Sequence, residues 1–369
     1  MAKPFLEKPE PDFSDRRAAG AKELRIGVIG AGFIAQVAHL HAFSRIPEAC
    51  LVTLAESDDF LRSEVASKFG IRDAMSNYRD LLRRQDIDAF VVCVPRRAQA
   101  LVVAEALSKG RPVLSEKPVA MTFDEAERMV SLAERAYAPW MVGYMKRFDP
   151  GVRRFKQVLS QFQANGDLGD MLSVEMRDFC ATYGVSIPEH VRRPGPRAYR
   201  YAEGPVAPDF LPPDRWADYE YTVNVASHDI NLLRMLFDEA LSVTSFVARP
   251  QGAQLARFDS AGIPINLVVA PMDVGYWDQR VDVNFRKGRL TLTLPSPLAR
   301  DRYAQIYLER HGAREEILLG AEKPVWAFEA QASAFVETAL ARTVPPNSGA
   351  ACLADMEIIE TLWKRMEWR

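Results

Sequence analysis

The sequence is poor in the features that mark membrane, secreted and metal-binding proteins. No run of about 18 apolar residues occurs, so a transmembrane helix is not expected. The 4 cysteines are scattered and lack the paired spacing of a zinc site or a disulfide framework. The formal net charge is only -2, which gives no general electrostatic footprint for nucleic acid. These absences favour a reducing, cytoplasmic setting with neither a membrane nor a nucleic-acid partner.

The chain is long enough for two domains, because 369 residues exceed what one hydrophobic core usually supports. Residues 1–23 are polar and lack the apolar core of a signal peptide, which predicts an N-terminal arm. From residue 24 to 145, apolar runs alternate with helical stretches. The runs are 24–29, 50–55, 89–94, 112–115 and 139–143, and the helical stretches are 33–45, 58–69, 97–108 and 123–136. Continuous apolar runs predict parallel strands covered by helices on both faces, as in a doubly wound Rossmann domain.

The second half shows a different pattern, in which apolar and polar residues alternate. The candidate strands are 172–179, 241–248, 264–270, 279–285 and 288–294. Alternation predicts a mostly antiparallel sheet with one open face, so residues 146–369 are expected to form an α+β domain. Helices are predicted at 326–341 and 351–366, and the last helix is placed to pack back on the first domain. A Pro-rich insertion at about 181–220 has a length typical of functional or disordered loops.

A glycine-rich turn follows the first apolar run. Gly30 permits a tight turn, Gly32 lets the backbone approach a pyrophosphate, and the small Ala35 lets helix and strand pack closely. Amides at the start of the helix would then meet the anion. The same pattern alone also fits a simple strand–helix turn, but the strand before it and the helix after it favour a dinucleotide site. We expect Phe33 and Ile34 to lie at this site.

The second apolar run ends at an acid, Glu56. A carboxylate there can accept both ribose hydroxyls and would repel a 2′-phosphate, which favours NAD over NADP. Asp58 fits better as the N-cap of the next helix. The alternative is that Glu56 is an ordinary exposed acid at the end of the strand.

A lysine stands where the fourth apolar run ends, in the stretch SEKP at 115–118. Ligands of open α/β sheets sit at the carboxyl ends of strands, so Lys117 should point into the crevice. Pro118 restricts Lys117 to extended conformations and so fixes the direction of its side chain. A cation there can stabilise developing alkoxide character on a substrate oxygen. By itself the stretch fits a surface turn equally well.

Several motifs in a fixed order make the sequence similar to a known family. They are GVIGAGFIA at 27–35, the acid Glu56, VP at 94–95, SEKP at 115–118, GYMKRFDP at 143–150 and SHDINLL at 227–233. This order resembles the glucose–fructose oxidoreductase, inositol dehydrogenase and MocA family. The resemblance implies a Rossmann domain, an α+β domain whose open sheet binds substrate and mediates homo-oligomerisation, and NAD(P)-dependent chemistry on sugars or polyols. It also implies that Lys117 is the active-site lysine and His228 the catalytic histidine, with Pro95, Arg96 and Glu116 beside the cofactor.

His228 also has the right chemistry for this role, because an imidazole can take a hydroxyl proton near neutral pH. Two positions depart from the family pattern. Asn224 stands where the family usually has an acid; it can orient His228 or a substrate hydroxyl but cannot carry negative charge. Gln99 stands where the family often has a histidine. His39, on the helix after the glycine turn, is expected to serve packing.

The Pro-rich insertion carries a basic and aromatic cluster. Its members include Arg197, Tyr199 and Tyr201, which could clamp an anionic group and stack on a sugar or base. A solvated basic loop explains the cluster equally well. Arg147 is a further candidate for the substrate or cofactor, with a salt bridge between domains as the alternative.

We therefore predict an NAD-dependent oxidoreductase that transfers a hydride between nicotinamide and a secondary alcohol or ketone of a sugar, polyol or sugar derivative. Lys117 and His228 would handle the proton, and no metal site is expected. Two alternatives are a lyase or glycosidase that uses NAD without net redox change, and a non-catalytic sensor of NAD or sugar.

Overall fold

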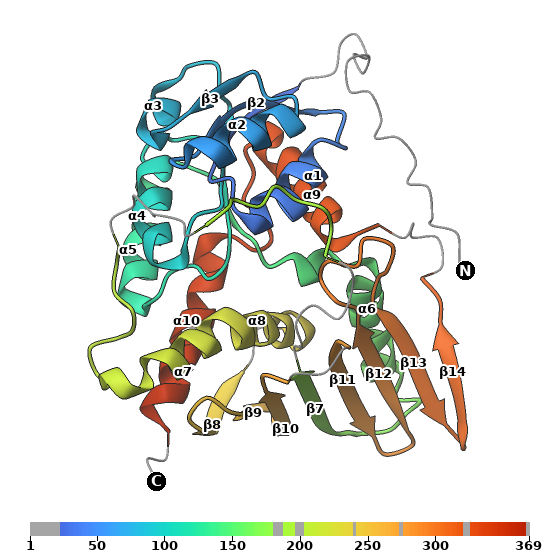
Figure 1. Cartoon of the computed structure of the whole chain (residues 1–369). Helices are drawn as coiled ribbons and strands as arrows, with labels where there is room; N and C mark the ends of the chain where they lie inside the picture. Colours follow the sequence, from blue (N-terminus) through green and yellow to red (C-terminus); the bar gives the residue numbers. More distant parts are fainter. Residues whose placement is uncertain are drawn as a thin grey trace, which may run out of the picture.

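The computed structural model describes residues 23–179, 187–195, 203–238, 241–272, 276–319 and 325–366. Two sheets organise this part of the chain, with the N-terminal sheet at the top of Figure 1 and the C-terminal sheet at the bottom. None of the helices in these ranges is long and apolar enough to cross a membrane.

The N-terminal sheet has six parallel strands in the order β3-β2-β1-β4-β5-β6. The strands are β1 Leu24–Ile29, β2 Ala49–Ala55, β3 Asp73–Met75, β4 Ala89–Val92, β5 Val113–Ser115 and β6 Trp140–Val142. The helices between them are η2 Ala35–Leu40, α1 His41–Phe43, α2 Asp59–Lys68, α3 Tyr78–Arg83, α4 Arg96–Leu107 and α5 Phe123–Arg135. The predicted doubly wound parallel sheet is confirmed.

Burial explains why these strands could be predicted. Every residue of β4 is buried, and so are five of the six residues of β1, because helices cover both faces of the sheet. Strand β3 and helix α3 were not predicted. Strand β3 has three residues, two of them exposed, so it carries no apolar run. The helix after β1 also differs from expectation, since it starts with π-type geometry over Ala35–Leu40.

The C-terminal sheet has eight strands in the order β14-β13-β12-β11-β7-β10-β9-β8. They are β7 Met171–Phe179, β8 Ser242–Ala248, β9 Gln254–Ser260, β10 Ile263–Val269, β11 Asp278–Phe285, β12 Gly288–Leu294, β13 Gln305–Arg310 and β14 Ala313–Ile317. Neighbouring strands are antiparallel except for the pair β7 and β10. The predicted α+β half with a mostly antiparallel sheet is confirmed, with β9, β13 and β14 as additions.

Helices join the two sheets. The remaining ones are η3 Met145–Phe148, α6 Pro150–Asn165, η4 Pro213–Arg215, α7 Trp216–Tyr221, η5 Thr222–Ala226, α8 Ser227–Leu236, α9 Ala327–Ala341 and α10 Gly349–Lys364. Helix α6 packs on β12 and β13, and α8 lies between the two sheets (Figure 1). The last helix, α10, contacts α5 and β6 of the N-terminal half as well as α8 and β8. Gly349 at its start lies directly against the ring of Trp140.

The strand order reverses between β1 and β4, which is the point where open α/β sheets bind ligands. The glycine turn follows β1, and Val94 and Pro95 follow β4. Gly30 has a φ of +96°, and a Cβ atom there would collide with the carbonyl of Cys93. Glycine is therefore required for the two loops to meet at the switch point.

Candidate active site

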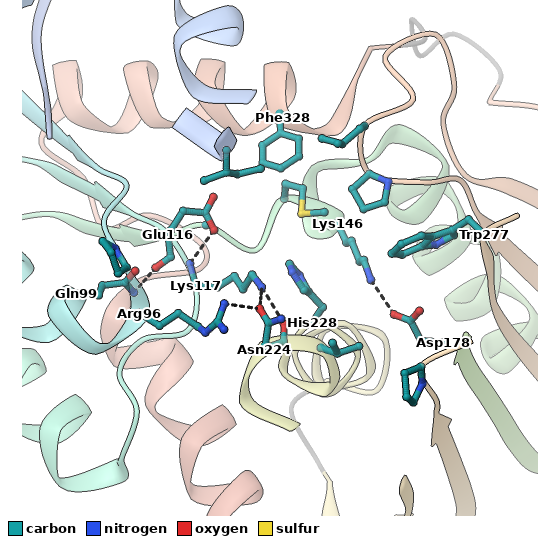
Figure 2. Close-up of a pocket in the computed structure, with 18 of the residues that line it drawn as sticks. Arg96, Gln99, Glu116, Lys117, Lys146, Asp178, Asn224, His228, Trp277 and Phe328 are labelled. Carbon is teal, nitrogen blue, oxygen red and sulfur yellow. Dashed lines mark hydrogen bonds and ion pairs between the residues drawn. The ribbon is translucent and has the colours of Figure 1, made fainter. Parts of the chain in front are cut away.

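A cavity of about 850 Å³ lies between the two sheets, below the switch point (Figure 2). The N-terminal half supplies the ends of its strands and loops: Ile34, Val94, Pro95, Arg96, Gln99, Glu116 and Lys117. The C-terminal half supplies the facing wall, which includes Lys146, Asp178, Asn224, His228 and Trp277. The cavity thus brings together residues more than a hundred positions apart in the sequence, among them both predicted proton-handling groups.

Lys117 extends from the end of β5 toward the C-terminal half. Its Nζ atom donates hydrogen bonds to the backbone oxygen of Asn224 at 2.8 Å and to the side-chain Oδ1 at 2.9 Å. The turn behind it is held by Gln99, a buried residue whose Nε2 donates to the carbonyl oxygens of Glu116 and Pro118. A glutamine at this position therefore orients the lysine loop through hydrogen bonds to its backbone.

His228 stands in the first turn of α8, directly after the π-type turn that carries Asn224. Its ring points into the cavity beside Lys117 and Lys146 (Figure 2). Burial lowers its pKa well below the usual value, and the charges of Lys117 and Lys146 lower it further. Among the described residues, no hydrogen-bond partner holds the Nδ1 atom. His228 is therefore a neutral imidazole that can accept a proton.

Asn224 connects the two halves by its oxygen atoms. Besides Lys117, the Nη1 atom of Arg96 donates to Asn224 Oδ1 at 3.2 Å, and Arg96 also forms an ion pair with Glu220 at 2.6 Å. A neutral amide thus accepts from two cations where the family pattern has an acid. The amide therefore brings no negative charge to this part of the site.

On the opposite wall of the cavity lie two further polar side chains, Lys146 and Asp178. Lys146 is buried, and its Nζ atom lies 3.5 Å from Asp178 and 3.7 Å from Asp229. The pKa of Asp229 is raised, first by burial and then by the negative charge of Asp178. The Oδ1 atom of Asp178 has no hydrogen-bond partner in the described ranges. Asp178 lines the cavity, so its carboxylate is a candidate acceptor for a ligand hydroxyl.

Glu116 faces the cavity but is held from behind. His39 lies 2.7 Å from its Oε1 atom, and the backbone amide of Lys117 donates to Oε2 at 3.2 Å. Burial opposes a charge on His39, but Cys93 and Glu116 outweigh it and raise the histidine pKa to about 10. His39 therefore does more than pack, because it fixes a carboxylate at the cavity wall.

Glu56 is not among the residues that line the cavity. Its Oε2 atom accepts from the amide of Ala31 at 2.9 Å and its Oε1 from the amide of Asp58 at 3.0 Å, and the side chain is fully buried. Asp58 caps α2 as expected, accepting from the amide of Leu61. Thus Glu56 braces the glycine turn through these two hydrogen bonds, and its contact with a ribose stays a prediction.

The remaining predicted residues fall into two groups. Arg147 is not part of the cavity lining; its side chain donates to Asn231, at 2.6 Å from Oδ1. Arg197, Tyr199 and Tyr201 lie outside the described residues. Asp178 and Trp277 were not predicted, because an acid near the end of an alternating strand and a lone tryptophan carry no motif.

Comparisons with known proteins agree with this geometry. Residues 24–144 match the model of the oxidoreductase family with an NAD-binding Rossmann fold. The chain is 26% identical over 333 residues to the uncharacterized oxidoreductase YrbE of Bacillus subtilis, covering 82% of this chain and 86% of that protein. It is 26% identical over 157 residues to the myo-inositol 2-dehydrogenase of Thermotoga maritima, covering 42% of this chain and 46% of that enzyme. The match to this enzyme thus spans less than half its length.

Solved structures share the whole fold. KijD10, a 3-ketoreductase from Actinomadura kijaniata in complex with NADP, has a TM-score of 0.74 at 19% identity, covering 94% of this chain and 98% of that chain. The parallel sheet with its glycine turn, joined to the second sheet, defines an oxidoreductase with an NAD(P)-binding Rossmann fold. More specifically, residues 24–144 are similar to the glucose–fructose oxidoreductase, inositol dehydrogenase and MocA family.

Proposed function

We propose that this protein transfers a hydride between a nicotinamide dinucleotide and a secondary alcohol or ketone of a sugar, polyol or sugar derivative. The observation that carries the proposal is that Lys117 and His228, from different halves of the chain, line one cavity beside the glycine turn. The relatives support the substrate class, since they include inositol dehydrogenases and a 3-reductase for a dTDP-linked dideoxyglucose from Saccharopolyspora spinosa.

The charge of each residue determines its role in the proposed reaction. When bound, the nicotinamide ring accepts or delivers the hydride. Lys117 Nζ stabilises negative charge on the reacting oxygen, and the neutral His228 takes the hydroxyl proton during oxidation. Asn224 holds the lysine by two hydrogen bonds. Asp178 and Lys146, on the opposite wall, offer an acceptor and a donor to the other hydroxyls of a polyol.

The residues at the switch point fit a dinucleotide. Gly30 lets the turn after β1 lie directly against the backbone of Cys93 after β4, and Pro95 and Arg96 begin α4 at the cavity edge. The sequence favours NAD through Glu56, but the buried hydrogen bonds of this carboxylate do not support a direct contact with ribose hydroxyls. The proposal therefore covers both NAD and NADP.

The test is to incubate the full-length protein with each nucleotide and a panel of sugars, polyols and nucleotide-linked sugars, while recording the absorbance of reduced nicotinamide. We expect turnover on at least one substrate in one direction. Substrate conversion with no net change in nicotinamide would indicate the lyase or glycosidase class. Nucleotide binding without any conversion would indicate a sensor, and no nucleotide binding at all would refute the proposal.

A further inference from the structure

Part of the Pro-rich insertion, residues 187–195, lies against the glycine turn. The side chain of the buried Gln36 accepts from the amide of Val191 at 2.8 Å and donates to its carbonyl oxygen at 3.2 Å. The same Gln36 amide donates to the oxygen of Ala31 in the turn at 2.9 Å. His190 meets the ring of Phe33 edge-on, with centroids 4.9 Å apart. Segment 187–195 is therefore docked on the nucleotide-binding half, as its yellow-green trace near α1 and α2 shows (Figure 1).

This docking places an arginine at the end of β2. The Nε atom of Arg193 forms an ion pair with Oδ2 of Asp58, whose other oxygen caps α2 by accepting from Leu61 at 3.0 Å. The Arg193 side chain remains 31% exposed, against 8% for Asp58. The guanidinium, rather than the carboxylate, is thus the more accessible partner of this pair.

The end of β2 is where the adenosine ribose of a dinucleotide is recognised in this type of fold. A carboxylate there selects the ribose hydroxyls of NAD, and an arginine accommodates the 2′-phosphate of NADP. In this structure Glu56 is fully buried, and its carboxylate oxygens accept hydrogen bonds from the backbone amides of Ala31 and Asp58. In the ion pair at this position the guanidinium of Arg193 is the more exposed group, and its Nη1 atom also donates to the carbonyl oxygen of Pro194 at 3.2 Å.

We propose that Arg193 is the residue that determines cofactor specificity, and that it does so by binding the 2′-phosphate of NADP(H). This inference rests on the proposed function and reverses the preference that Glu56 indicated from sequence. Arginine suits the task because its planar fork binds phosphate oxygens through two parallel hydrogen bonds. Arg62 lies nearby, where its Nη1 atom donates to the backbone oxygen of Glu56 at 3.0 Å and its Nη2 atom pairs with Asp59 at 2.7 Å.

The experiment is to titrate full-length wild type, Arg193→Ala and Arg193→Gln with NADPH and NADH, following nucleotide fluorescence. We expect wild type to bind NADPH the more tightly. Loss of a charged hydrogen bond should weaken NADPH binding by roughly 10- to 100-fold in both variants. NADH binding should change by less than about threefold, because NADH has no 2′-phosphate. Arg192→Ala is the matched control: the adjacent arginine is exposed, and its removal should alter neither affinity.

The outcomes separate this inference from the proposed function. A wild type that prefers NADH, or Arg193 variants that weaken both nucleotides equally, would overturn the role of Arg193 while leaving the oxidoreductase intact. Arg193→Gln guards against a purely structural loss, since an amide can still donate to Asp58 and hold the segment. Wild type that binds neither nucleotide would instead refute the proposed function itself.

Discussion

At the scale of single residues, the site has an amide, Asn224, where the family pattern has an acid. Asn224 accepts hydrogen bonds from Lys117 and Arg96, and no negative charge at that position balances them. His228 lies beside Lys117 and Lys146, which together with burial keep the imidazole neutral. The amide therefore holds the lysine through hydrogen bonds without adding a negative charge beside the imidazole. This separation of geometry from charge can be tested.

The first prediction concerns Lys117. Lys117→Met keeps the length of the side chain but removes the cation that stabilises charge on the reacting oxygen. We expect kcat to fall by about 10²- to 10³-fold, the usual effect of removing one donor of this kind. Steady-state kinetics on the best substrate measure the effect, and far-ultraviolet circular dichroism controls for folding. A folded variant with wild-type turnover would exclude Lys117 from the chemistry.

The second prediction concerns pH. A base works in its unprotonated form, so oxidation by wild type should lose activity only as the pH falls through the lowered pKa of His228, below the ordinary value of about 6.5. Asn224→Asp places a carboxylate near His228, which should favour the imidazolium and raise this pKa. The acidic limb of the kcat/KM profile should therefore move to higher pH in Asn224→Asp. An unmoved limb would mean that another group is the base.

At the scale of secondary-structure elements, apolar pattern determined what could be predicted. Buried strands such as β1 and β4 are continuous apolar runs, so their positions were predicted to within a few residues. Strand β3 and the hairpin of β13 and β14 were not predicted, because their residues are mostly exposed or show only weak alternation of apolar and polar side chains. Lys117 could be found because a motif and a strand end coincide there. Asp178 could not, since its place in the site depends on contacts with residues distant in sequence, Lys146 at 3.5 Å and Gln279 at 2.9 Å.

The third prediction concerns the turn after β1. Gly30→Ala adds a Cβ atom that collides with the backbone of Cys93 at a φ of +96°. We expect the free energy of unfolding to fall by more than about 2 kcal/mol, and nucleotide binding to weaken, because the β1 and β4 loops must separate. Chemical denaturation and nucleotide titration measure the two effects.

Gly70→Ala is the matched control for this variant. Gly70 also has a positive φ, of +64°, but no atom lies within 4 Å of an added Cβ. Its replacement should cost only the backbone strain, about 1–2 kcal/mol, and leave nucleotide binding unchanged. Equal losses of stability and of binding in the two variants would contradict the role assigned to the contact with Cys93.

At the scale of the whole molecule, contacts between distant segments decide the parts of the site that sequence could not reveal. The basic cluster of the insertion was interpreted either as a clamp for an anionic substrate or as a solvated loop, and its described Arg193 meets Asp58 just after β2, 135 positions earlier. No local pattern encodes such a contact. Only the joint docking of segment 187–195 on Gln36 and Phe33 brings it about.

The C-terminal sheet presents a polar face away from its helices. Figure 1 shows α6 behind β12 and β13, and the residues of β11 are alternately half-buried and buried. On the opposite face, polar side chains of neighbouring strands interact with each other. Asn266 donates a hydrogen bond to Glu175 at 3.0 Å, and Arg177 forms an ion pair with Asp278 at 2.9 Å. An interface on this face would consist largely of polar contacts, which makes it sensitive to the sign of a single central charge.

The fourth prediction is that the protein forms a homo-oligomer through this face. Glu175 is exposed on β7, which lies between β11 and β10 in the middle of the sheet. Glu175→Arg reverses a charge at the centre of the interface and should lower the mass measured by light scattering to that of a smaller species. Glu127→Arg, an equal reversal at an exposed position of α5, should leave the mass unchanged. A monomeric wild type, or an unchanged mass for Glu175→Arg, would show that this face does not join subunits.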